Sequence, residues 1–127
     1  MYANGEFKSY TDGKSITDKY SAAYWQLQRM SVVNGLYMEG EYVGIAISSF
    51  YGRVGDKFRI TLSSGQVFYA VMTDTKQSSQ LDENYTHPDG SLIEFIVDTP
   101  TLPEQVRLEG SLNCIYTGSI EKIERME

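Results

Sequence analysis

The chain has 127 residues, of which 41% are hydrophobic, and it carries a formal net charge of −6. The length and the globular composition predict one domain with one core, without disulfide support. The acidic balance disfavours nucleic acid and anionic membrane surfaces as partners, because both are bound through basic clusters. No apolar run reaches the about 18 residues of a membrane span, and residues 1–20 contain no hydrophobic signal core. We therefore expect no direct membrane insertion, and an extracellular or cell-wall location if the chain is an excised domain.

The first third of the chain is expected to hold a leader and a helix. Residues 1–17 are rich in Gly, Ser, Lys and Asp without an apolar period, which predicts a leader or linker. From Asp18 to Val33 apolar residues recur at helical spacing, which predicts a helix of about four turns. Thr17 or Asp18 can cap its start, and Asn34-Gly35 can end it in the left-handed conformation.

After Gly40 the sequence takes on the pattern of strands. Apolar and β-branched runs alternate with turn residues, as in Ser63-Ser64-Gly65-Gln66. Residues 76–90 form a long polar stretch, which predicts a mobile or functional loop. With the helix, the pattern indicates a mainly β domain over residues 18–127, a small barrel or sandwich with the helix packed on it. Strands are expected at Tyr42–Ser48, Lys57–Leu62, Val67–Thr73, Ser91–Val97 and Gly118–Met126.

Three carboxylates are candidates for chemistry. Asp74 ends a hydrophobic strand where the long loop begins, Glu94 lies inside the next hydrophobic strand, and Asp98 closes that strand. Two carboxylates across a sugar-binding groove are the usual equipment for cleaving a glycosidic bond. Spacing alone favours the alternative, in which Asp74 and Asp98 are ordinary strand-end residues and Glu94 faces solvent. Since the chain has one cysteine and one histidine, we expect no metal and no cofactor.

The order and spacing of four segments resemble a known β-barrel family. In the three-aspartate (3D) domains an Asp-Thr pair follows one strand and an Ile-Asp pair lies in a later strand. Asp74-Thr75 matches the first pair, and Ile93-Glu94 matches the second with Glu in place of Asp. The resemblance implies a six-stranded double-psi β-barrel, here with an N-terminal α-helix, related to the barrels of membrane-bound lytic transglycosylase A, rare lipoprotein A and expansins. The segments that carry it are Gly44–Ser48, Val54–Phe58, Val71–Thr75 and Ile93–Asp98.

That resemblance implies a domain that cleaves peptidoglycan or another glycan. Asp74 would be the catalytic acid and base, Glu94 its catalytic partner, and Thr75, His87 and Asp98 would contact the substrate. The family's Gly-Gly-x-Ile-x-Gly stretch is replaced here by residues 76–79 and a longer polar loop. The chain is also similar to uncharacterised proteins of Gram-positive bacteria and their mobile elements. The alternative is therefore a non-catalytic carbohydrate- or protein-binding barrel of a cell-surface or mobile-element protein.

Overall fold

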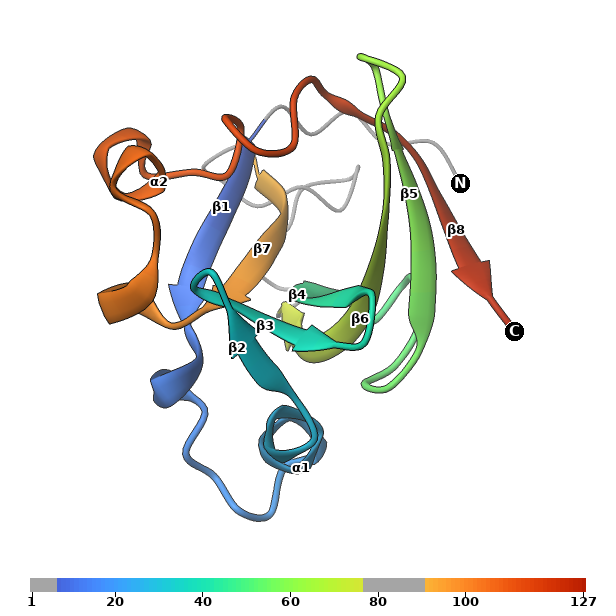
Figure 1. Ribbon diagram of the computed structural model, residues 1–127. Coiled ribbons are helices and arrows are strands. Elements are labelled where there is room, and N and C mark those ends of the chain that lie inside the picture. Colours follow the sequence, from blue (N-terminus) through green and yellow to red (C-terminus); the bar gives the residue numbers. More distant parts are fainter. Residues whose placement is uncertain (1–6, 77–90) are drawn as a thin grey trace.

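One mixed β-sheet organises the protein in the computed structural model, which describes residues 7–76 and 91–127 (Figure 1). Within these two ranges, two short α-helices and two 3-10 turns accompany the sheet. The helical elements are η1 (Gly13–Ser15), α1 (Ala22–Gln28), η3 (Thr99–Thr101) and α2 (Glu104–Glu109). The strands are β1 (Phe7–Asp12), β2 (Ser31–Val33), β3 (Leu36–Glu39), β4 (Tyr42–Ser48), β5 (Lys57–Leu62), β6 (Val67–Lys76), β7 (Ser91–Val97) and β8 (Ile120–Met126).

The strands follow the order β1-β7-β3-β4-β6-β5-β8, with β2 paired to β3 and an additional pairing of β4 with β7. The β4–β6 and β1–β7 pairs are parallel, and the other pairs are antiparallel. Within residues 7–76 and 91–127 the sheet is open, with β1 and β8 at its two ends. The mainly β fold is thus confirmed, whereas closure into a six-stranded barrel is not seen.

The strand predictions after Gly40 are confirmed. The bounds of β4, β5 and β7 agree with the sequence pattern, β6 extends three residues further, to Lys76, and β8 begins two residues later, at Ile120. In β5 the alternation of Phe58, Ile60 and Leu62 with polar residues places these three side chains in the core, where each is fully buried.

Two hydrophobic clusters lie on opposite faces of the sheet. The main core takes side chains from β3 to β8 and includes the fully buried Ile45 and Phe95. A smaller cluster joins Leu27 of α1 to Ala46 of β4 and Ile96 of β7. Because β4 contributes to both clusters, it is covered on both faces, and α1 packs on the outer one. This confirms that the helix lies against the sheet.

The predicted helix bounds were wrong. α1 has seven residues instead of sixteen, and its N-cap is Ser21, whose Oγ accepts a hydrogen bond from the Tyr24 N–H at 3.2 Å. Asn34 and Gly35 form a two-residue turn between β2 and β3, with φ of 52° and 82°. Asn-Gly supplies the two positive φ angles that a tight hairpin needs, so the hairpin takes the residues that we expected to end the helix.

The expected leader is also corrected. Phe7–Asp12 forms β1, which pairs in parallel with β7, and Tyr10 packs against the main core. The strand is ordered by main-chain pairing to β7, a contribution that the side-chain pattern does not report. Across the described ranges, no helix combines the length and the apolar character that crossing a bilayer requires.

Candidate functional site

A β-bulge at Thr73 decides which way Asp74 faces. Ile45 of β4 is opposite Met72 of β6, but the next residue, Ala46, is opposite Asp74, so Thr73 is an extra residue in β6. Alternation from the buried Met72 would otherwise send Asp74 into the main core. The bulge instead turns Asp74 to the outer face, beside Ala46. Thr73 itself is fully buried, and its hydroxyl lies 3.2 Å from the Val71 carbonyl oxygen.

Glu94 reaches the same face from the other side of β4. Its neighbours Ile93 and Phe95 are fully buried in the main core, so alternation places Glu94 on the outer face. Ala46 is its partner in the β4–β7 register as well as the partner of Asp74. Asp74 and Glu94 thus stand on either side of one small residue, with roughly 10 Å expected between their Cα atoms, two strand spacings. The structure thus places these two predicted residues on the same face of the sheet, with β4 between their strands.

The third charged residue that we consider on this face is a buried lysine, Lys76. Lys76 follows Asp74 by two residues on β6, and its side chain is only 3% exposed. Its Nζ lies 4.0 Å from the Glu94 Oε1, while the Glu94 side chain is 29% exposed. Sequence reasoning missed Lys76 because β6 was expected to end at Thr73. The β-favouring Thr73 and Thr75 around Asp74 were the signal that the strand continues.

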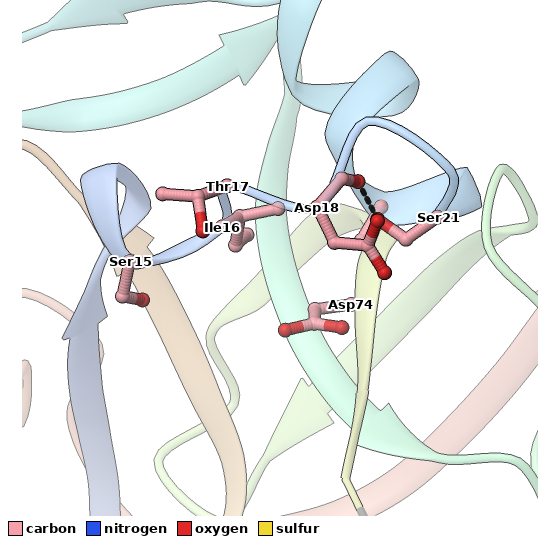
Figure 2. Close-up of a pocket in the computed structure, with 7 residues that line it drawn as sticks. Ser15, Ile16, Thr17, Asp18, Ser21 and Asp74 are labelled. Atoms are coloured by element: carbon pink, nitrogen blue, oxygen red, sulfur yellow. Dashed lines mark hydrogen bonds between the residues drawn. The ribbon is translucent and has the colours of Figure 1, made fainter.

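Asp74 also lines a pocket of about 270 Å³ beside the N-terminus of α1 (Figure 2). Figure 2 shows the chain from Ser15 to Ser21 passing over the Asp74 side chain. The Ser21 hydroxyl donates to the Asp18 carbonyl oxygen at 2.7 Å, and Asp18 Oδ1 accepts from the Tyr20 N–H at 2.9 Å, which fix this wall. The lining is Ser15, Ile16, Thr17, Asp18, Ser21, Ala23 and Asp74.

That lining offers three hydroxyl groups and two carboxylates within one hollow. Hydroxyls both donate and accept hydrogen bonds, and carboxylates accept them, so the pocket suits a ligand rich in hydroxyl groups. Asp18 was expected only as a helix cap, and its place in the pocket depends on the turn before α1. No sequence period marks that turn.

Of the remaining predicted site residues, Thr75 and Asp98 do not line this pocket. Thr75 is exposed, and its N–H donates to Asp74 Oδ1 at 2.8 Å. Asp98 lies at the far end of β7, where it accepts from the Thr101 hydroxyl at 2.7 Å and pairs with Lys14 at 3.7 Å. The structure therefore does not bring Asp98 to Asp74. His87 lies outside the described residues, and so do residues 77–90 of the segment that we predicted to be a mobile or functional loop.

The described residues were also compared with what a metal site or a reactive thiol requires. In the part of the chain that the structure describes, no group of three or more His, Cys, Asp or Glu side chains could hold a metal ion. Cys114 is exposed. Neighbouring atoms that displace water, followed by the Glu109 carboxylate, raise the pKa of Cys114, which disfavours the reactive thiolate.

The described site thus combines a pocket lined by Asp74 and Asp18 with the Glu94–Lys76 pair, which lies on the same outer face of the sheet as Asp74. A group that gives and takes a proton in a hydroxyl-lined pocket can perform acid–base chemistry on a sugar. Comparison with known families and with curated proteins found no family model and no curated protein that matches this chain.

Proposed function

We propose that this chain is a peptidoglycan-cleaving domain of the lytic transglycosylase type, with Asp74 as its acid and base. The observation that carries the proposal is the position of Asp74: the bulge at Thr73 turns it out of the core and into a pocket lined by hydroxyls. The match of Asp74-Thr75 to the Asp-Thr pair of the 3D domains supports the same assignment. On this proposal the domain acts at the cell wall.

The proposed reaction needs one proton-transfer group. Asp74 first gives its proton to the glycosidic oxygen as the bond from that oxygen to the anomeric carbon breaks. The 6-hydroxyl of the same sugar then attacks the anomeric carbon, and its proton passes to Asp74. The products are a free hydroxyl on one fragment and a 1,6-anhydro ring on the other, and Asp74 returns to its starting state.

Glu94 and Lys76 would support this chemistry as positioning residues. Glu94 contacts the buried ammonium, and Lys76 lies on the same face of β6 as Asp74. A fixed cation on that face would favour negative charge as it develops on Asp74 during proton donation. We assign Glu94 the role of holding Lys76 in place. This role fits the lining of the pocket, which includes Asp74 and does not include Glu94.

We also propose that the finer fold is a double-psi β-barrel. Its support is the main core, which receives side chains from β8 at one end of the sheet and from β1 at the other, through Ile123 and Tyr10. A sheet whose two ends reach one core is strongly coiled, as barrels are.

The test uses purified peptidoglycan and the chain with Asp74→Asn, which keeps the shape of the side chain and removes its titrating proton. Cleavage is measured by mass spectrometry as the release of fragments with anhydro ends. We expect its rate to fall by a factor on the order of a hundred. Glu124→Gln, on the exposed edge strand β8, is the matched carboxylate-to-amide control and should cleave as the parent does. Equal cleavage by the parent and Asp74→Asn would refute the assignment. Wall binding by a parent that cleaves nothing would favour the non-catalytic binding module.

A further inference from the structure

A second hollow, of about 250 Å³, lies along α1 and is lined by side chains of the helix and of the turn before β5. Ala22 lines this groove, while the next residue, Ala23, lines the Asp74 pocket, so the first turn of α1 separates the two sites. The volume is below the roughly 300–1,000 Å³ of pockets for drug-sized ligands, which suits a single ring. The lining is Ala22, Trp25, Gln26, Arg29, Val54 and Gly55.

Trp25 presents an apolar ring to solvent in this groove. The residue is 59% exposed. Its Nε1–H donates to the Lys19 carbonyl oxygen at 2.8 Å, and the Tyr24 ring meets it edge-on with 5.2 Å between centroids. The indole is therefore held in place before any ligand arrives, which lowers the entropy cost of binding against it.

Glu39 organises the polar side of the groove. Gln26, which is 5% exposed, donates from Nε2 to Glu39 Oε1 at 2.6 Å, and Arg29 and Lys57 approach Glu39 Oε2 at 3.9 and 3.3 Å. The hydrogen bond from Gln26, together with these two cations, holds the pKa of Glu39 below its ordinary value. Glu39 thus offsets the charge of Arg29, whose guanidinium carries five N–H donors in a fixed plane.

We propose that this groove is a second sugar subsite, which binds one pyranose ring of the same glycan strand that enters the Asp74 pocket. This inference rests on the proposed function. A pyranose presents an apolar C–H face, which can lie on the indole, and a rim of hydroxyls, which can accept from Arg29. The acidic chain, with a net charge of −6, disfavours an anionic ligand in the same place.

Trp25 is the single tryptophan of the chain, so its fluorescence reports on this groove alone. In the Asp74→Asn protein, in which we expect cleavage to be slower by a factor on the order of a hundred, titration with β-1,4-linked N-acetylglucosamine oligomers should shift or quench the emission. By calorimetry, Trp25→Ala in that background should bind the oligomers at least about tenfold more weakly, the size of effect found for a buried aromatic anchor. Tyr20→Ala removes a fully exposed aromatic that lines neither hollow and is the control. Circular dichroism checks folding, and Arg29→Gln should weaken binding in the same direction.

The outcomes separate the two proposals. Unchanged oligomer affinity in Trp25→Ala and Arg29→Gln would overturn the subsite, even if the parent cleaves wall. Loss of affinity in these variants, from a parent that cleaves nothing, would support the subsite and refute the proposed reaction. Failure of the oligomers to bind, or binding of wall stem peptides in their place, would overturn the sugar assignment.

Discussion

Replacing Glu94 and replacing Lys76 should lower the free energy of unfolding by different amounts, because the two side chains differ in exposure. Glu94→Gln leaves the ammonium, 3% exposed, without this carboxylate, whereas Lys76→Met leaves a carboxylate that is 29% exposed and can turn to water. Losing the partner of an exposed charge costs about 0.2–1 kcal/mol, and losing that of a buried charge about 3–5 kcal/mol. At 4.0 Å and partial burial, we expect about 2–3 kcal/mol for Glu94→Gln. For Lys76→Met, which keeps most of the apolar stem, we expect about 1 kcal/mol or less.

Urea denaturation measures this difference. Since the free energy of unfolding falls by about 1–3 kcal/mol per molar urea, a gap of about 2 kcal/mol moves the midpoint by roughly 1 M. The double variant should recover part of the Glu94→Gln loss, because the buried ammonium is then gone. Equal midpoints for the two single variants, or a lower midpoint for Lys76→Met, would refute the reasoning from burial.

Two further variants test the hairpin and the Glu39 contacts. Gly35→Ala should lower the free energy of unfolding by roughly 2–4 kcal/mol in thermal unfolding, because φ is +82° and the new Cβ would lie 2.6 Å from the Leu102 Cα. The control, Gly65→Ala, has φ +91° but open space around it, and should cost only about 1–2 kcal/mol. Equal losses in the two variants would contradict the close approach at Gly35. Glu39→Gln should be less stable than the parent above pH 4.5, the ordinary pKa of this group, because the native state holds that pKa lower. The gap should shrink as the pH falls from 4.5 through the lowered native value, and a gap in urea midpoints that is the same at pH 7 and pH 3 would count against the assignment.

The strands could be predicted from sequence because the pattern of apolar residues that marks each strand lies within the strand itself. In β5 the alternation of apolar and polar side chains indicates both the extended conformation and the inward face. β7 is instead a short apolar run interrupted by Glu94, which is typical of a strand buried on both faces. The helix was overestimated because its apolar period continues into β2, and only the tertiary pairing of Val33 with Leu36 shows that Asn34-Gly35 closes a hairpin. The first strand left no such local pattern, since its partner β7 begins 84 residues further along the sequence.

The site was predictable in part for the same reason. Asp74 and Glu94 were found because each interrupts or ends an apolar strand. That both carboxylates are opposite Ala46 could not be predicted, because this pairing depends on an inserted residue in β6 and on two separate strand registers. Lys76 was missed because β6 continues past Thr73, whereas the places of Asp18 and the exposed ring of Trp25 depend on the path of the turn before α1. That path is set by packing among distant segments.

The parallel pairing of β1 with β7 also affects how the chain folds. Its first partners in register, Phe7 and Ser91, are 84 residues apart in the sequence, so this ladder forms only after the segment up to β7 has been synthesised. Contacts at such sequence separation carry a high loop-closure cost and slow the search for the native state. The N-terminal strand should therefore dock late, and until then the main-chain groups along one side of β7 are open to pairing with other chains.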